Sequence, residues 1–319
     1  MLVSQRYVVG VDGGGTKTVA LLASADGKLL GRGEAGSSNY HNIGPNDAAE
    51  SIKRAVSEAK KDANAWRRKP EIAVVALAAI DSPTDKLVTT RFVRDANIAR
   101  RSIVIHDTLA ALYAATQGGP GIIVISGTGC VAAGINKAGK YARSGGWGYL
   151  IDDEGSAYDI GREALKQAFR AIDGRSPPTN LVSILAREFK VKSLEDIQKR
   201  LYSDGMSVEE IAHLSPLVSR AASRDKVSRE ILARAGMKLG ELACTVARRL
   251  KMTHEQFTLS AVGGNFRSGH FLLQPFEERI KKECPKARIV ILKTEPAQGA
   301  LALALSELSK RVRGQKQRS

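Results

Sequence analysis

The feature that most constrains the fold is the glycine-rich stretch at residues 8–18, which reads Val-Val-Gly-Val-Asp-Gly-Gly-Gly-Thr-Lys-Thr. The apolar start predicts a buried strand that ends at Asp12, after which the chain turns on three glycines. Because glycine has no Cβ, backbone N–H groups in such a turn can close around anionic oxygens, while the hydroxyls of Thr16 and Thr18 and the charge of Lys17 add donors. The stretch therefore predicts a hairpin that holds phosphate groups, with Asp12 facing the accompanying metal ion.

Two better-known glycine motifs do not fit this stretch. A P-loop has Gly-Lys-Ser/Thr leading directly into a helix, but Thr16 separates Gly15 from Lys17 and strand-like residues 19–23 follow. The dinucleotide-binding fingerprint lacks its third glycine and its helix. A turn and a further strand over 25–33 place the glycines between antiparallel strands. On the motif alone, a tight hairpin without a ligand is the alternative.

Composition narrows the classes of function. The 319 residues suffice for two domains. Neither an apolar run of about 20 residues nor an apolar signal core before Asp12 occurs, so we expect a cytoplasmic protein without a membrane partner. The three cysteines are far apart without a CxxC pair, and the five histidines show no HExxH spacing, which argues against a disulfide framework and against thiolate or zinc sites.

The net charge of +16 raises the question of nucleic acid. Proteins that bind nucleic acid usually add an aromatic stacking platform or a recognisable motif, and aromatic residues make up only 5% of this chain. The basic residues are spread along the sequence, and the acid-free end at 310–318 is typical of a solvated tail. We therefore do not expect a nucleic-acid partner.

The segment after the opening hairpins contains a candidate substrate loop. Residues 36–45, which include Asn39, are more polar than a short connection requires. Asn46 or Asp47 is expected to cap the following helix, and the apolar run at 72–80 predicts a strand covered on both faces.

Asp107 lies between a predicted strand at 102–106 and a helical run at 108–115. A carboxylate between the carboxyl end of a strand and the amino end of a helix is on the usual ligand side of an α/β sheet. Aspartate is also a favoured N-cap, and that role alone would explain it. Both interpretations stay open for this segment taken by itself.

Residues 122–129 repeat the opening pattern of an apolar strand followed by a Gly/Thr turn. A shift of 112 positions places Gly15 on Gly127 and Thr16 on Thr128. This internal duplication predicts two similar α/β lobes that face each other, each offering one glycine hairpin to a shared cleft.

The second half continues with Trp147 between glycines, three consecutive acids at 152–154, and a predicted helix at about 157–172. Residues from about 177 to 251 are mostly helical by their spacing. Strands are predicted at 257–262, which leads into Gly263-Gly264, and at 288–292, before a helix of small residues. The two glycines could let an adenine ring lie against backbone, or could allow close packing of a helix on a strand.

These residues and motifs together resemble the sugar-kinase branch of the actin, hexokinase and heat-shock ATPase superfamily. Within that branch the chain is similar to the group of N-acetylglucosamine kinases and archaeal broad-specificity hexokinases, which also includes the ATPase component of benzoyl-CoA reductase. The resemblance runs nearly end to end. Its markers are residues 12–18, Asn39, His106-Asp107, 127–129, 145–148, 153–158 and Gly263-Gly264.

The resemblance implies two duplicated lobes of the ribonuclease H-like, actin-like ATPase type, with a helical insertion in the second and the active site in the interlobe cleft. The N-terminal lobe would span 1–116 and the C-terminal lobe 117–319, with helices over about 177–251. The last helix, at about 296–310, would be able to pack back on the N-terminal lobe. A homodimer is also expected.

The resemblance further implies the roles of the site residues. Asp107 would be the base that takes the proton from the attacking sugar hydroxyl, and Asp12 would orient hydrated Mg²⁺. The sugar would be held by Asn39, Asp107, Gly146, Trp147 and Asp153. The phosphates of ATP would be held by Gly14, Gly15, Thr16, Lys17, Thr128 and Gly129, with Gly263 and Gly264 beside the adenosine.

The expected activity is ATP-dependent phosphorylation of the 6-hydroxyl of a hexose or amino sugar such as N-acetylglucosamine, glucosamine or glucose, with ATP and Mg²⁺. Asp152 stands where the family often has glycine, which leaves the sugar open while mildly favouring a cationic one. The alternative is an ATPase of the benzoyl-CoA reductase activator type that drives a partner without sugar. The lone cysteines argue against it, because an iron–sulfur cluster consumes several thiolates.

Overall fold

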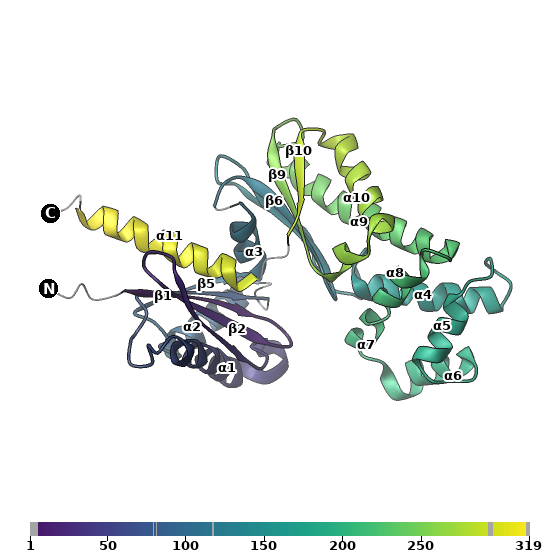
Figure 1. Ribbon diagram of the computed structural model, residues 1–319, viewed down its shortest axis with the longest axis horizontal. Helices are drawn as coiled ribbons and strands as arrows, with labels where there is room; N and C mark the ends of the chain where they lie inside the picture. The colour runs from purple at the N-terminus through teal and green to yellow at the C-terminus, as the bar shows by residue number, and fades with distance from the viewer. Residues whose placement is uncertain (1–5, 79, 81, 117, 293–295, 317–319) are drawn as a thin grey trace. The chain divides into compact units, whose positions relative to one another are not determined.

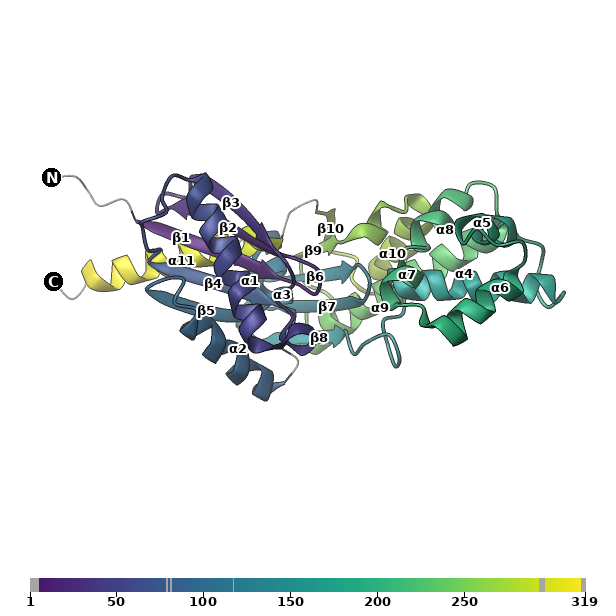
Figure 2. The same ribbon diagram turned by 90° about the horizontal axis from the view of Figure 1, so that it is seen from below.

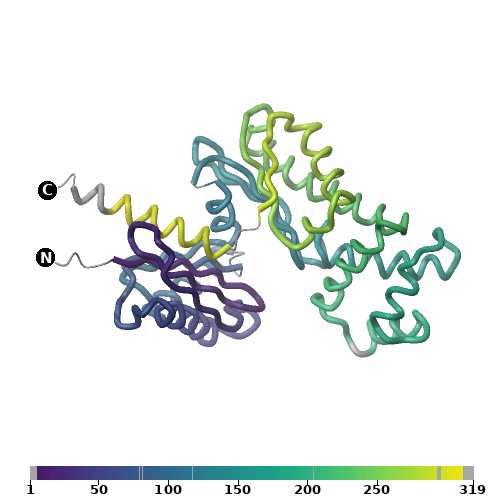
Figure 3. The backbone as a smooth tube through the Cα atoms, in the orientation of Figure 1, coloured from purple at the N-terminus to yellow at the C-terminus, as the bar shows by residue number. Residues whose placement is uncertain are grey.

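The structure is a computed structural model that describes residues 6–78, 80, 82–116, 118–292 and 296–316, without the side chains of Asp204 and residues 312–316. The chain divides into two compact units, one made of Met1–Gly119 and Thr294–Ser319 and the other of Pro120–Lys293. The backbone passes once into the second unit and once back (Figure 3). The expected boundary at 116/117 adjoins Gln117, which lies outside the described residues.

The first unit is built on a five-stranded sheet with the order β3-β2-β1-β4-β5. Its strands β1, β4 and β5 are parallel, and β2 is antiparallel to both β1 and β3. The elements are β1 (Tyr7–Gly13), β2 (Thr18–Ser24), β3 (Leu29–Ala35), α1 (Tyr40–Asp62), β4 (Ile72–Leu77), α2 (Pro83–Asp95), β5 (Arg101–His106), α3 (Asp107–Thr116) and α11 (Pro296–Lys316).

Both faces of this sheet are covered, as the apolar strands predict (Figures 1 and 2). Successive residues of a strand point to opposite faces, so Val9 and Val11 pack with Ile52 of α1 and Phe92 of α2, whereas Val8 packs with α3 and α11. Helix α11 crosses β1 so closely that a Cβ on Gly10 would lie 2.1 Å from the backbone nitrogen of Leu301. The C-terminal helix is therefore part of the first unit's core.

The second unit repeats this topology with the order β10-β9-β6-β7-β8. Helices α9 and α10 pack on one face of its sheet, while α4 to α8 form a helical group in which α4 and α8 pack against α9 (Figure 1). The elements are β6 (Gly121–Ser126), β7 (Cys130–Ile135), β8 (Tyr141–Gly145), α4 (Ala157–Ile172), α5 (Leu181–Glu188), α6 (Leu194–Lys199), the π-helix η1 (Arg200–Gly205), α7 (Val208–Ala212), α8 (Ser215–Ala221), α9 (Lys226–Leu250), β9 (Phe257–Val262), the 3-10 helix η2 (Gly264–Arg267), α10 (His270–Glu283) and β10 (Ala287–Ile291).

The matching sheet orders confirm the internal duplication, with β6 to β10 in the places of β1 to β5. The shift of 112 positions also maps the first residue of β2, Thr18, onto that of β7, Cys130, and Leu29 of β3 onto Tyr141 of β8. The units differ in their helices, because five helices and a π-helix lie between β8 and α9 where the first unit has only the connection from β3 to α1. The predicted α/β class with a helical insertion is confirmed.

One local prediction is wrong. Helix α1 begins at Tyr40 inside the predicted loop, with Asn39 as its N-cap, rather than at Asn46 or Asp47. Gly44 interrupts it with φ 81° and ψ 161°, and Pro45 then restarts the helix. The apolar spacing predicted only the long part of α1 after Gly44, because the first turn of the helix ends at this kink.

Candidate active site

The candidate residues of the first unit gather at one edge of its sheet. Strands β1, β3, β4 and β5 run in the same direction, so Asp12, Asn39 and Asp107 all follow or end strands at their carboxyl edge. Gly13 pairs with Leu77, and Leu77 pairs with His106. Strands β1 and β5 are thus separated by one strand, or about 10 Å. This is the edge at which α/β sheets bind ligands.

The first hairpin leaves a row of backbone donors exposed. The N–H of Gly14 donates to the carbonyl of Lys17 at 3.0 Å, so it closes the turn. No described residue accepts a hydrogen bond from the N–H of Gly15, Thr16 or Lys17, and all three residues are exposed. A Cβ on Gly15 would meet no atom within 4 Å. Successive free N–H groups of this kind form a concave site for an anion.

Thr18 does not belong to this row, and the expectation that its hydroxyl faces a phosphate is wrong. Its side chain is buried, and its hydroxyl donates to the carbonyl of Gly36 at 2.8 Å. The next residues of that loop also support the hairpin, because Ser38 N–H and the Ser37 hydroxyl both donate to the Gly14 carbonyl, at 3.1 and 3.3 Å. The loop that leads to Asn39 is therefore attached to the phosphate hairpin.

Asn39 caps α1, since its side-chain oxygen accepts from the N–H of His41 at 3.1 Å. The neighbouring Tyr40 donates its hydroxyl to the carboxylate of Asp85, which also accepts from Ser82 N–H at 2.7 Å in the capping box of α2. Asn39 is thus held between the hairpin and the start of α2. Sequence reasoning missed Asp85, because no motif marks it.

Asp107 begins α3 directly after β5. Its Oδ1 accepts from the N–H of the next residue, Thr108, at 2.6 Å and lies 2.6 Å from Nδ1 of His106. An N-cap normally accepts from the N–H two or three residues ahead, so the observed bond differs from the usual cap. The side chain is 31% exposed and is accessible to a ligand at this edge.

The second hairpin is stabilised by hydrogen bonds from the first turn of α4. The N–H of Gly127 donates to the carbonyl of Gly129 at 2.9 Å, and the first turn of α4 donates back to the hairpin, Ala157 N–H to Gly127 at 2.8 Å and Tyr158 N–H to Thr128 at 3.3 Å. Thr128 itself is exposed. A Cβ on Gly127 would meet no atom within 4 Å, so this backbone also borders open space.

Asp153 lies beneath that hairpin. It is 6% exposed, adopts φ 64°, and accepts from Cys130 N–H at 3.0 Å. A Cβ on Gly129 would lie 2.8 Å from its Oδ2. Burial is the main cause that raises the pKa of Asp153 above its ordinary value, and the neighbouring charge of Asp152 adds to it.

Trp147 stands on the loop between β8 and the acidic turn and is 69% exposed. Its backbone N–H donates to the Asp152 carboxylate at 3.2 Å. The Arg143 guanidinium lies 5.3 Å from the centre of the Trp147 ring and donates to the Gly146 carbonyl. Asp152 therefore fastens the loop that carries Trp147.

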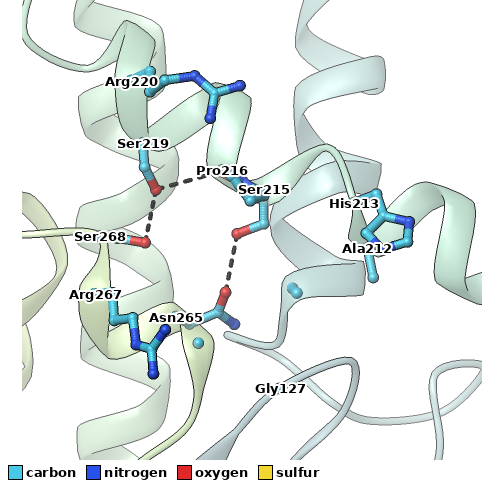
Figure 4. A pocket seen from close by; sticks show the side chains of 12 residues that line it. Gly127, Ala212, His213, Ser215, Pro216, Ser219, Arg220, Asn265, Arg267 and Ser268 are labelled. Atoms are coloured by element: carbon cyan, nitrogen blue, oxygen red, sulfur yellow. Dashed lines mark hydrogen bonds between the residues drawn. The ribbon is translucent and has the colours of Figure 1, made fainter. Parts of the chain in front are cut away.

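A cavity of about 450 Å³ opens beside Gly127 and Gly264 (Figure 4). A Cβ on Gly264 would meet no atom within 4 Å, whereas one on Gly263 would lie 2.0 Å from the carbonyl oxygen of Ser126. Gly264 thus borders the cavity, and Gly263 lets the chain pack on β6. The other lining residues come from α4, α7, α8, η2 and their adjoining loops: Ala157, Ala212, His213, Ser215, Pro216, Ser219, Arg220, Asn265, Arg267 and Ser268.

Asn265 joins the elements that surround this cavity (Figure 4). Its amide oxygen accepts from the Ser215 hydroxyl at 2.9 Å, and its amide nitrogen donates to the Ser126 hydroxyl at 2.9 Å. The Ser126 hydroxyl donates in turn to the Gly155 carbonyl at 3.0 Å. Sequence reasoning missed Asn265 and the lining residues of α7 and α8, because they stand in helical segments without a motif.

The described part of the chain has no group of three His, Cys, Asp or Glu side chains arranged to hold a metal ion. Mg²⁺ in nucleotide sites usually has one or two carboxylates together with phosphate oxygens and water. The carboxylate of Asp12, half-buried beside the first hairpin, fits that arrangement. Among the helices of the described part of the chain, none combines the length and the apolar character of a membrane span.

Comparison with known proteins decides the family. The model of the BadF/BadG/BcrA/BcrD ATPase family matches residues 9–304. The chain belongs to this family. Among curated members of similar sequence, an N-acetylmuramic acid/N-acetylglucosamine kinase of Clostridium acetobutylicum is 33% identical over 303 residues, covering 95% of this chain and 99% of the relative. An N-acetyl-D-glucosamine kinase of Dictyostelium discoideum is 33% identical over 316 residues, with the same coverage.

Solved structures agree with this BadF/BadG/BcrA/BcrD fold. A candidate N-acetylglucosamine kinase from Chromobacterium violaceum has a TM-score of 0.75 at 27% identity, covering 94% of this chain and 99% of that one. A ROK family glucokinase from Streptomyces griseus, solved with glucose and AMPPNP, has a TM-score of 0.61 at 17% identity, covering 93% and 98%. The second likeness concerns the fold alone.

Proposed function

We propose that this protein is an ATP-dependent amino-sugar kinase that phosphorylates the 6-hydroxyl of its substrate. The observation that carries the proposal is the sheet edge of the first unit, where Asp107, Asp12 and the free N–H groups of the first hairpin come together. The curated relatives that match the chain from end to end act on amino sugars by their names, which supports an amino sugar as substrate.

The two glycine hairpins bind the phosphates of ATP in this proposal. Gly15, Thr16 and Lys17 offer free N–H groups, and Gly14 closes their turn. Thr128 and Gly129 act from the second hairpin, and the adenosine occupies the cavity beside Gly264, with Gly263 supporting it. Phosphoryl transfer requires positioning and neutralisation of charge more than covalent catalysis, so backbone donors suit it.

Asp12 holds Mg²⁺ through water, and the ion supplies neutralisation of the phosphate oxygens. Asp107 takes the proton of the attacking hydroxyl. Asn39, Gly146, Trp147 and Asp153 hold the sugar together with Asp107. Asp152 accepts a hydrogen bond from the backbone N–H of Trp147 and so shapes the loop that carries this side chain.

The alternative, an ATPase that drives a partner without sugar, is not favoured by the relatives. The three cysteines, Cys130, Cys244 and Cys284, are all buried. The expected homodimer stays a prediction that light scattering of the purified protein would test.

The test is ADP release with ATP and Mg²⁺ against N-acetylglucosamine, N-acetylmuramic acid, glucosamine, glucose and a blank without sugar. We expect stimulation by at least one amino sugar. The variant Asp107→Asn should lower kcat by at least about 10²-fold, because it removes the general base, while ATP binding stays near that of the parent. Equal ADP release in every tube would contradict the kinase, and near-normal turnover of the variant would contradict the base.

A further inference from the structure

The carboxylate of Asp107 uses its two oxygens unequally. Both of its contacts meet at Oδ1, where the Thr108 N–H and the His106 Nδ1 each lie at 2.6 Å. Among the described residues, no hydrogen-bond partner of Oδ2 is found. The carboxylate is thus fastened through one oxygen, and the other is available for a ligand.

The contact between His106 and Asp107 requires a proton. A carboxylate oxygen and an unprotonated ring nitrogen both carry lone pairs, and 2.6 Å would place these lone pairs against each other. A proton therefore lies between the two atoms. With Asp107 ionised, as a base must be, that proton belongs to Nδ1, and His106 donates to Oδ1. Thr108 approaches the same nitrogen with its hydroxyl, at 2.8 Å, and with its backbone N–H, at 3.2 Å, although that N–H makes its shorter bond, 2.6 Å, to Oδ1 of Asp107. The 2.6 Å separation of Nδ1 and Oδ1 is shorter than the contact between the Thr108 N–H and Nδ1, so it decides where the hydrogen of the ring lies.

The other ring nitrogen agrees with this tautomer. Nε2 of His106 is buried and has no hydrogen-bond partner in the described part of the chain. A second proton there would leave a charged ring with a buried N–H and no acceptor, which is costlier than leaving a lone pair unpaired. The arrangement favours a neutral ring that carries its hydrogen on Nδ1.

We propose that His106 is a positioning residue for Asp107: its Nδ1–H holds Oδ1, so that Oδ2 is the atom that receives the proton of the sugar hydroxyl. The inference rests on the proposed kinase function and adds the residue that orients its base. The sugar hydroxyl oxygen bonds to the γ-phosphorus of ATP while the bond from that phosphorus to the bridging oxygen breaks, so ADP leaves with this oxygen. The O–H bond of the sugar hydroxyl breaks in the same step, and its proton goes to Oδ2. His106 keeps its own proton and does not touch the sugar.

Orientation of the base affects turnover more than binding. If the Nδ1–H is lost, the carboxylate can rotate about the Thr108 contact, and a misplacement of about 1 Å costs on the order of 10²-fold in rate. Asp107 is one of five residues proposed to hold the sugar, and ATP is held by the glycine hairpins, so the KM values should change less than kcat. If His106 were only a structural residue, its loss would not be expected to lower kcat while leaving KM nearly unchanged.

Two substitutions of similar polarity test the position of the donor. The amide nitrogen of asparagine can occupy the place of Nδ1, whereas that of glutamine reaches the place of Nε2. We expect His106→Asn to keep kcat within about threefold of the parent and His106→Gln to lower it by about 10- to 100-fold, with KM changed by no more than about twofold. His254→Asn and His254→Gln, at an exposed histidine, are the matched controls.

An equal loss of kcat in the two His106 variants would indicate that the histidine only packs against its neighbours. An unchanged kcat in both would indicate that Thr108 alone suffices to orient Asp107. Either result overturns the proposal. If the parent shows no sugar-dependent ADP release, the kinase function fails instead. Nitrogen NMR of the ¹⁵N-histidine-labelled parent provides a measurement independent of activity and of variant folding. A hydrogen on Nδ1 of His106 is expected, and a hydrogen on Nε2 alone would overturn the proposal.

Discussion

The two glycine hairpins descend from one duplicated pattern, yet they are supported in different ways. The first is fastened through carbonyl and hydroxyl groups to a short loop, 36–38, and leaves three consecutive N–H groups free. The second receives the first turn of α4 on its carbonyls and has the buried Asp153 beneath it. Helix α4, the first helix of the insertion after β8, thus donates hydrogen bonds to the second hairpin, and no helix does so for the first hairpin among the described residues. The same motif can therefore be expected to respond differently to the same substitution.

The largest expected effect comes from breaking the polar network beside the second hairpin. Asn265→Leu removes the three hydrogen bonds of a buried amide and leaves the Ser215 hydroxyl without its acceptor, so the free energy of unfolding should fall by about 3 kcal/mol and the KM for ATP should rise. Denaturant unfolding and initial rates measure the two effects. The first-hairpin counterpart, Thr18→Val, loses one bond to Gly36 and should cost about 1 kcal/mol. Similar costs for both variants would remove the contrast between the hairpins.

A matched pair of glycine substitutions sharpens the comparison. In Gly129→Ala the new methyl would meet Asp153 at 2.8 Å, so we expect a loss of about 1–3 kcal/mol in unfolding free energy. In Gly15→Ala the methyl would enter open space, and stability should stay within about 0.5 kcal/mol of the parent. Gly15→Ala should instead raise the KM for ATP, because the methyl enters the space given to the phosphates. An equal loss of stability in both would show that the hairpins are equally packed.

The smallest expected effect concerns the charge beneath the second hairpin. Since burial raises the pKa of Asp153, the folded state holds the proton more tightly than the unfolded state, and ionisation lowers stability as the pH rises from the ordinary pKa of aspartate through the raised one. Asp153→Asn keeps an acceptor for the Cys130 N–H without the charge. It should be more stable than the parent at about pH 7, with the advantage shrinking toward about pH 4.

Thermal unfolding of Asp153→Asn across this range measures the effect. Asp95→Asn, at a side chain that is 58% exposed, serves as the control and should show no such trend. An advantage that does not depend on pH would contradict the role given to burial.

Much of the fold followed from the sequence because its signals are local. Apolar runs predicted the strands, and the recurrence of Gly15-Thr16 at Gly127-Thr128 predicted the duplicated sheets, since a hairpin motif fixes the antiparallel pairing beside it. The start of α1 was missed because Gly44 divides the helix, and the periodicity reported only the longer part. No local pattern could reveal that Thr18 turns its hydroxyl to Gly36.

The candidate site divides in the same way. Asp12, Asp107 and the hairpin residues stand where strands meet turns, so the edge of the sheet could be inferred from strand order alone. The hydrogen bonds of Asn265 join residues that are far apart in the sequence, such as Ser126 and Ser215. Such pairings depend on tertiary packing, and no short stretch of the sequence carries a pattern that predicts them. The roles of the individual residues stay predictions until the variants are measured.

The close crossing of α11 over Gly10 has a consequence for the order of events during synthesis. The strands of the first sheet leave the ribosome before those of the second, but the face lined by Val8 has no cover from Ala297, Ala300 and Leu301 until α11 has been synthesised. The second unit, whose residues are contiguous, can collapse before its predecessor is complete. The helix that covers this face is therefore synthesised after the strands of both sheets, and a chain terminated before α11 would present an apolar sheet face to the cell's chaperones and proteases.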